Sequence, residues 1–208
     1  MDASLLLKKV KLPVILIDNG HGVETPGKRS PDGTFREYQW CREVANMVCD
    51  LLQAEGYKAR LLVPEKTDIS LDERCKRANK YDKKDTLLVS IHNNAAGNGQ
   101  KWAKARGWAV YTTRGITAAD RLAEALYQRA RQAFKYPLTV RTYSNEQYGH
   151  DFEADFKILL RSYCPAVLIE HFFMDNKDDV EYLKTAKAKA TCAEVIVAGI
   201  KDYLRCIG

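Results

Sequence analysis

The chain has 208 residues, of which 46% are hydrophobic and 29% are charged, and its formal net charge is +6. This length suits a single domain with a sizeable core, and the ordinary composition excludes a disordered or fibrous chain. No apolar stretch approaches the roughly 20 residues of a membrane-spanning helix, so membrane insertion is not expected.

The first predicted elements alternate between strand and helix. Residues 13–18 form an apolar, β-branched run of strand length that is closed by Asn-Gly. Apolar residues at helical spacing predict a helix over 36–55, and residues 57–63 again have the pattern of a strand. A helix over 70–82 opens on the Ser-x-x-Glu pattern of a capping box.

The second half of the chain continues this alternation. Strands are expected at 86–92 and 107–113, a helix follows at 117–135, and a further strand lies at 165–170. The segment 136–155 shows neither period. Two helices close the chain, one beginning near 176 and one over 187–204.

This order predicts an α/β fold, because strands that alternate with helices form a sheet covered on both faces. We expect a single domain with a mixed, mainly parallel twisted sheet, similar to phosphorylase- and hydrolase-like folds. Residues 13–208 are interpreted as this domain and residues 1–12 as an N-terminal extension.

The charge and the N-terminus bear on partners and location. Lysines and arginines are spread through every predicted helix, so they favour an acidic polymer such as bacterial cell wall as readily as nucleic acid, or simply a solvated surface. Three leucines followed by lysines are too short an apolar run for a signal peptide. We therefore expect synthesis in the cytoplasm without a visible export signal, and we expect most of the six cysteines to remain reduced.

Three apolar strands each deliver an ionisable residue at or just past the carboxyl end: His21, His92 and Glu170. Ligands gather at this edge of such sheets. Glu37 follows a loop that could bring it back over the first strand. Two histidines and a carboxylate are a common ligand set for catalytic zinc, which keeps a fourth position open for water.

Each of these residues also has a structural interpretation. The histidines could be hydrogen-bonded loop residues, and Glu37 could be a favourable carboxylate at a helix N-terminus. Glu170 could form a buried ion pair with a lysine or arginine, because a buried carboxylate requires a partner. Position and spacing alone leave these alternatives open.

The sequence resembles the zinc-dependent N-acetylmuramoyl-L-alanine amidases of the type 3 amidase family over about residues 14–204. The similarity covers several motifs in the same order, which makes it more specific than any one of them. The matching segments are IDNGHG (17–22), TPG (25–27), REYQW (36–40), GYKARLL followed by TDISLDERCKRAN (56–79), LLVSIHNNA (87–95) and ILLRSYCPAVLIEHFFMDN (158–176). Three positions depart from the family pattern, with Asn19 in place of proline and Val23 and Phe172 in place of glycine. LLVPE (61–65) lacks the family's threonine-arginine.

The resemblance implies that His21, Glu37 and His92 bind one zinc ion and that Glu170 is the catalytic carboxylate. It also implies a peptidoglycan substrate and not nucleic acid, cleaved at the amide between the lactyl group of N-acetylmuramic acid and L-alanine. Further candidates for substrate contact are Asn94, Arg161 and His150. His171 would point away from Glu170 in a strand, so a structural role is expected for it.

Two other functions stay open from the sequence. One is a non-catalytic wall-binding protein of the same fold, and the other is a zinc carboxypeptidase that acts on stem peptides. A monomer is expected. The chain is similar to a phage or prophage endolysin that accumulates in the cytoplasm before it reaches the wall, or to an exported bacterial amidase without its leader.

Overall fold

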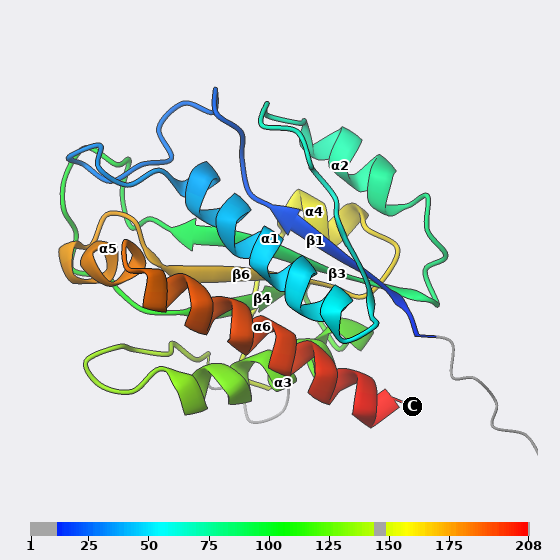
Figure 1. Cartoon of the computed structure of the whole chain (residues 1–208). Helices are drawn as coiled ribbons and strands as arrows, with labels where there is room; N and C mark the ends of the chain where they lie inside the picture. Colours follow the sequence, from blue (N-terminus) through cyan, green and yellow to red (C-terminus); the bar gives the residue numbers. More distant parts are fainter. Residues whose placement is uncertain (1–11, 144–148, 208) are drawn as a thin grey trace, which may run out of the picture.

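The computed structural model describes residues 12–143 and 149–207, which form a six-stranded sheet with helices on both faces (Figure 1). The predicted extension at 1–12 lies outside these residues except for residue 12, so that boundary stays a prediction. The strands run in the order β2-β1-β3-β6-β4-β5. Their bounds are β1 Val14–Asn19, β2 Lys58–Leu61, β3 Thr86–Asn94, β4 Ala109–Thr112, β5 Phe152–Glu153 and β6 Ala166–Phe173.

The pairing of the strands confirms a mixed, mainly parallel sheet. β2, β1, β3 and β6 are mutually parallel, whereas β4 runs antiparallel to β6 and β5 is parallel to β4. The carboxyl ends of β1, β3 and β6 therefore meet at one edge, together with the amino end of β4. This is the edge at which the sequence places its ionisable residues.

The helices form two unequal layers. The larger layer packs a wide apolar core against one face of the sheet, and the smaller one covers only part of the other face (Figure 1). The larger layer consists of α1 Glu37–Ala54, α3 Ala118–Ala133, α5 Lys177–Leu183 and α6 Ala186–Ile207, and the smaller one of α2 Leu71–Ala78 and α4 Lys157–Arg161.

Strand alternation decides which side chains reach the less covered face. Leu16, Leu88 and Leu168 pack in the smaller core beneath α2 and α4. Since successive side chains in a strand point to opposite faces, residues two and four positions further on share this face. The same face is therefore apolar near the amino ends of the strands and polar at their carboxyl ends, where His92 and Glu170 stand.

Two elements are not predicted from the sequence. β5 has only two residues and lies in the segment without a clear period, and α4 has only five residues. Neither is long enough to show a hydrophobic repeat. The long strands and helices lie where the sequence predicts them, with ends that differ by a few residues.

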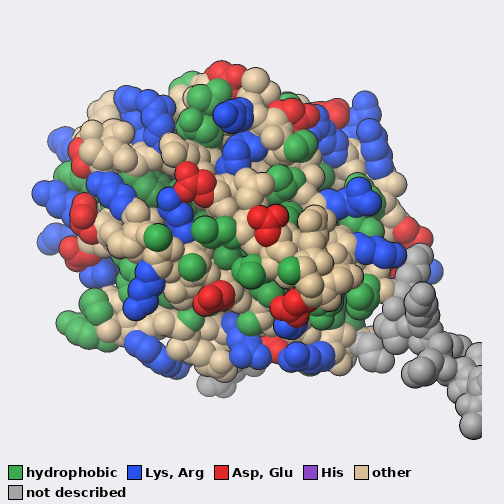
Figure 2. Space-filling model, in the orientation of Figure 1, with side chains coloured by type: hydrophobic (Ala, Val, Ile, Leu, Met, Phe, Trp, Pro, Cys, Tyr) green, Lys and Arg blue, Asp and Glu red, His purple; other side chains and the backbone are tan. Residues whose placement is uncertain are grey.

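The surface and the cysteines agree with the composition. Lysine and arginine side chains are spread over the face formed by α1, α3 and α6, with acidic side chains among them (Figure 2). All six cysteines are free, and five of them are buried. Within residues 12–143 and 149–207, no helix combines the length and apolar character that a membrane crossing requires.

Candidate metal centre

Three side chains from distant parts of the chain converge at the carboxyl edge of the sheet. His21 Nε2 lies 3.3 Å from Glu37 Oε1, and His92 Nδ1 lies 3.0 Å from the same oxygen. One ligand atom from each residue lies within 4.8 Å of the other two. This is the set that the sequence predicts as zinc ligands, and its geometry brings two nitrogens and a carboxylate to one point.

The unpaired polar atoms of the cluster fit a metal ion. Glu37 is 1% exposed, and its Oε2 has no hydrogen-bond partner within the described residues. His21 Nε2 is likewise buried without a hydrogen-bond partner there. Buried polar atoms normally have a hydrogen-bond partner or a metal ion, so a bound ion would satisfy these two atoms. Imidazole nitrogen and carboxylate oxygen are ordinary zinc ligands.

His21 reaches the cluster through an unusual backbone conformation. It follows β1 and has φ +64°, in the left-handed region that most side chains avoid. The glycines on either side allow other parts of the protein to pack closely against this turn. A Cβ at Gly20 would lie 2.4 Å from His92 Cε1, and one at Gly22 would lie 2.1 Å from the backbone nitrogen of Asp68. The left-handed turn after β1 is thus made by His21 itself, and the glycines beside it provide space.

We expect Gly20→Ala to weaken zinc binding by about 10- to 100-fold, as changes behind a metal ligand usually do. The new methyl group would overlap the His92 ring and turn it away from Glu37. Competition with a chelating dye measures the affinity. Gly97→Ala is a matched control, because its Cβ would meet only Asp175 Oδ2 at 3.8 Å. Equal affinities in the two variants would contradict this account.

Glu37 is brought back to His21 by a closed turn. The Ser30 N–H donates a hydrogen bond to the Phe35 carbonyl at 3.0 Å. The Ser30 hydroxyl accepts a hydrogen bond from the Phe35 N–H at 3.0 Å and donates one to the Asp32 carboxylate. The Glu37 N–H then donates to the Lys28 carbonyl at 3.0 Å. This turn places Glu37, the first residue of α1, over the end of β1, which is the return that the sequence analysis considers for the loop before Glu37.

The charges in the cluster are mutually stabilising. Burial alone would raise the pKa of Glu37, but the nearby rings of His21 and His92 outweigh burial and lower that pKa well below the ordinary range. Burial likewise opposes the charged form of His92, and the Glu37 carboxylate raises the His92 pKa above its usual value. Glu37 also accepts a hydrogen bond from the Asn93 N–H at 3.0 Å. The carboxylate is therefore held ionised and in place.

Glu170 stands directly beside His92, because the two residues are partners in the β3–β6 register. Its Oε2 is buried without a hydrogen-bond partner within the described residues, and no lysine or arginine there forms an ion pair with it. Burial raises the pKa of Glu170 to about 8, and the Glu37 carboxylate adds to the rise. The structure thus favours a functional carboxylate over the buried ion pair that the sequence left open.

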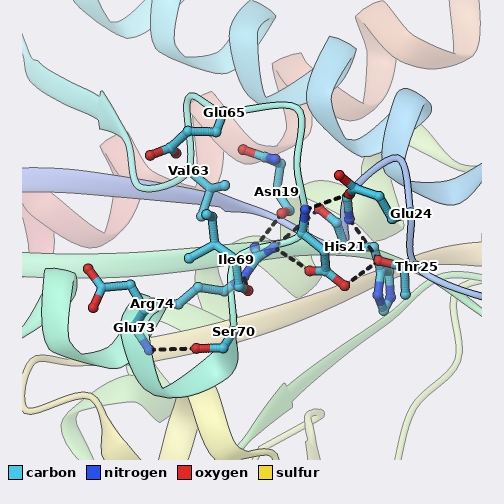
Figure 3. A network of polar contacts seen from close by, with 12 residues as sticks. Asn19, His21, Glu24, Thr25, Val63, Glu65, Ile69, Ser70, Glu73 and Arg74 are labelled. Atoms are coloured by element: carbon cyan, nitrogen blue, oxygen red, sulfur yellow. Dashed lines mark hydrogen bonds and ion pairs between the residues drawn. The ribbon is translucent and has the colours of Figure 1, made fainter.

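Arg74 ties the His21 loop to α2 (Figure 3). It is 2% exposed and donates to three backbone carbonyls, those of Asn19 at 2.6 Å, His21 at 3.1 Å and Ile69 at 2.7 Å. It also forms a buried ion pair with Asp18 at 2.7 Å. Sequence analysis does not single out Arg74, although it lies in a segment of the family resemblance. Its contacts depend on a loop conformation that no local pattern reveals.

The further candidates for substrate contact lie in three different places. Asn94 stands at the end of β3, and its side chain interacts with the Tyr111 hydroxyl close to Glu170. Arg161 lies instead in α4 near the amino end of β6, where its carbonyl accepts from Asn79 Nδ2. The structure therefore does not bring Arg161 to the metal cluster, because the short α4 carries it to the opposite edge of the sheet.

His150 and His171 are both engaged away from the cluster. His150 Nδ1 lies 2.8 Å from Glu124 Oε2, and its ring stacks on Tyr127 at 4.2 Å, which attaches it to α3 on the other side of the sheet. His171 is fully buried between Trp40 and Trp108, and burial lowers its pKa to about 3. Its neutral ring in the apolar core agrees with the structural role expected for it.

Phe172 explains one departure from the family pattern. Its φ is +64°, a conformation that suits the glycine expected there. Such backbone strain costs about 1 to 3 kcal/mol. Phe172 is fully buried and packs on Phe134 at 5.1 Å and Tyr182 at 5.2 Å, and burial of an aromatic ring offsets a cost of that size.

Comparison with known proteins identifies the family of the chain. The sequence pattern of the Amidase_3 family, described as N-acetylmuramoyl-L-alanine amidase, matches residues 15–202. The chain belongs to this family. Zinc dependence is general in Amidase_3, and the His21, Glu37 and His92 cluster agrees with it.

Individual relatives include bacterial and phage proteins. The N-acetylmuramoyl-L-alanine amidase AmiC of Neisseria meningitidis is 27% identical over 92% of this chain and 53% of its own length. The endolysin of Bacillus phage SPP1 is 26% identical over 92% of this chain and 66% of its own length. The chain thus spans about half to two thirds of these relatives.

A solved structure agrees over nearly its full length. The N-acetylmuramoyl-L-alanine amidase from Clostridium difficile 630 has a TM-score of 0.79 and 26% identity, and the match covers 95% of this chain and 100% of that one. The fold is therefore that of an amidase catalytic domain.

Proposed function

We propose that the protein is a zinc-dependent N-acetylmuramoyl-L-alanine amidase, which hydrolyses the amide between the lactyl group of N-acetylmuramic acid and the L-alanine of the stem peptide. The observation that carries this proposal is the cluster of His21, Glu37 and His92 with Glu170 beside it. Family membership over residues 15–202 supports the same reaction.

In this proposal His21, Glu37 and His92 hold one zinc ion. When bound, zinc would lower the pKa of a water molecule to about 7 and polarise the amide carbonyl. Glu170 takes the proton from the attacking water on a carboxylate oxygen and then passes a proton to the departing amine nitrogen. Arg74 keeps the His21 loop in place, and Asn93 orients Glu37 through its N–H.

Burial raises the pKa of Glu170 in the metal-free protein. Once ionised, a carboxylate with a raised pKa is a stronger base than an exposed one, as the proposed proton transfer from water requires.

The two other functions are less well supported. A wall-binding protein without catalysis has no use for a buried, unpaired carboxylate such as Glu170, which costs stability. A stem-peptide carboxypeptidase would use similar chemistry on a different bond. It differs from the amidase only in the product it releases.

The products of digested peptidoglycan test the proposal. We expect the zinc-loaded protein to release intact stem peptides and leave glycan chains with free lactyl groups, as measured by mass spectrometry. A chelator should abolish release, and added zinc should restore it. Loss of only a terminal residue would identify a carboxypeptidase, and wall binding with no cleavage by the zinc-loaded protein would identify a binder.

The partners and the location follow from this reaction. We propose that the substrate is the cell wall, reached on the outer side of the membrane, and that the protein acts as a monomer. The names of the phage endolysin and the bacterial amidase among the relatives are compatible with either origin. On the face shown in Figure 2, lysine and arginine side chains are interspersed with acidic ones, which supports the proposal that nucleic acid is not a partner.

A further inference from the structure

Arg141 belongs to the same row across the sheet as the proposed catalytic residues. His92 and Glu170 are partners in one strand pair, and Glu170 and Ala109 are partners in the next. Trp108 forms a parallel bridge with Val140, and the Arg141 N–H donates to the Trp108 carbonyl at 2.8 Å. Arg141 therefore stands beside Ala109, on the face of the sheet that carries Glu170.

The side chain of Arg141 is held by aromatic neighbours. Its guanidinium carbon lies 5.0 Å from the centre of the Phe152 ring and 5.2 Å from that of Phe173. The guanidinium also interacts with the Tyr111 hydroxyl, and its charge acts on Glu170. Such contacts fix a guanidinium without using all of its five hydrogen-bond donors.

Arg141 still has donors to offer a ligand. It is half-buried, and none of the carboxylates in residues 12–143 and 149–207 lies within ion-pair distance of it. The fork of a guanidinium matches a carboxylate, to which it can donate two parallel hydrogen bonds. A fixed, partly exposed arginine beside a catalytic carboxylate is therefore suited to bind an anionic group of the substrate.

The spacing indicates which group of the substrate reaches Arg141. Neighbouring strands lie about 4.8 Å apart, so the backbones of Arg141 and Glu170 are separated by about 10 Å, with the small side chain of Ala109 between them. An extended peptide advances about 3.5 Å per residue. With the scissile amide at Glu170, Arg141 is thus within reach of a carboxylate on the second residue of the stem peptide.

The arginine on the other side of the metal cluster is already paired. There a cavity of about 230 Å³ is lined by Asp18, Asp68, Ser70 and Arg74, next to His21 and His92. Arg74 forms ion pairs with Asp18 at 2.7 Å and with Asp68 at 3.4 Å, so its charge is compensated within the protein. Arg141 forms no ion pair within the described residues, so the anionic peptide is expected on the β4 side and the glycan on the β1 side.

We propose that Arg141, supported by Phe152, Phe173 and Tyr111, forms a subsite for a free carboxylate on the second residue of the stem peptide. This inference rests on the proposed amidase function. It assigns the direction of the substrate and a preference: the protein distinguishes an acidic second residue from one whose carboxylate is amidated.

The test uses two synthetic substrates that differ at one group, N-acetylmuramoyl-L-alanyl-D-isoglutamate and its D-isoglutamine amide. We expect the zinc-loaded protein to cleave the acid with a kcat/KM about 10- to 100-fold higher, the usual effect of a charge-assisted hydrogen bond. Arg141→Gln should lose that preference, so that the kcat/KM for the acid falls further than that for the amide and the two become similar.

Arg131→Gln is a matched control. Arg131 also lies over an aromatic ring, that of Tyr127, and donates a hydrogen bond to the Tyr127 hydroxyl at 3.1 Å. It belongs, however, to α3 on the other side of the sheet. It should keep the preference. An unchanged preference in Arg141→Gln, or an equal loss on both substrates, would overturn the subsite.

A binding measurement separates this inference from the proposed function. Calorimetric titration of the zinc-loaded Glu170→Gln protein with each substrate should show tighter binding of the acid, and Arg141→Gln in the same background should remove the difference. If no variant cleaves either substrate, the amidase proposal fails, and the titration still decides the subsite. Equal binding of acid and amide would overturn it.

Discussion

Glu170→Gln is expected to reduce release of stem peptides from purified peptidoglycan by at least about 1,000-fold while zinc remains bound. Proton transfer by a positioned side chain typically contributes 10²- to 10⁴-fold, and Glu170 is proposed to act twice in each turnover. Glutamine keeps the shape of the side chain but cannot accept the proton. Stem-peptide release and the zinc content of the purified variant are measured together.

A second carboxylate in the same sheet provides the control for this change. Glu153 is exposed on β5, and its Oε1 accepts only the Gly115 N–H among the contacts of the described residues. Glu153→Gln should keep activity and zinc. Substantial cleavage by zinc-loaded Glu170→Gln would remove Glu170 from the catalytic role, and a zinc-free variant would assign it to metal binding.

The pKa of Glu170 also predicts a difference in stability. Its pKa is about 8 in the folded protein and about 4.5 when the side chain is exposed in the unfolded chain, so ionisation is harder after folding. The contribution of neutral Glu170 to the free energy of unfolding is complete below pH 4.5 and is lost as the pH rises towards 8. Metal-free Glu170→Gln avoids this loss. The carboxylate is thus retained at a cost to stability, which is common at functional sites.

The fold and the metal cluster were largely predictable because they depend on local patterns. Long apolar runs indicate β1, β3 and β6, and the two-residue alternation places His92 and Glu170 on one face. Parallel order then brings the carboxyl ends of these strands to the same edge. The turn at 30–35 is likewise indicated by its residue types.

The surroundings of the site were less predictable because they depend on topology. Arg141 lies in the segment without a clear period, and its place beside Ala109 follows from the antiparallel β4. Arg161 is one of the sequence candidates for substrate contact, and α4 holds it at the amino ends of the strands, away from the metal cluster. Sequence order alone does not distinguish the two edges for short elements.

Arg74→Met is expected to lower the free energy of unfolding by about 3 to 5 kcal/mol and to weaken zinc binding. Loss of one partner from a buried ion pair leaves an uncompensated charge, here Asp18, which among the described residues retains only the Ser90 hydroxyl at 2.6 Å. The carbonyls of Asn19 and His21 also lose their donor. Urea unfolding of the metal-free protein and zinc titration measure the two effects separately.

Arg77, one turn further along α2, is the matched control. It pairs with Glu65 at 2.8 Å and Glu73 at 3.3 Å, but its side chain is 24% exposed, so Arg77→Met should cost about 0 to 1 kcal/mol. The two variants delete the same group from the same helix, and only Arg74 bonds to the His21 loop. If Arg74→Met had the same stability and zinc affinity as Arg77→Met, the loop would hold His21 in its left-handed conformation without Arg74. A loss of zinc affinity confined to Arg74→Met would instead identify Arg74 as the residue that positions His21.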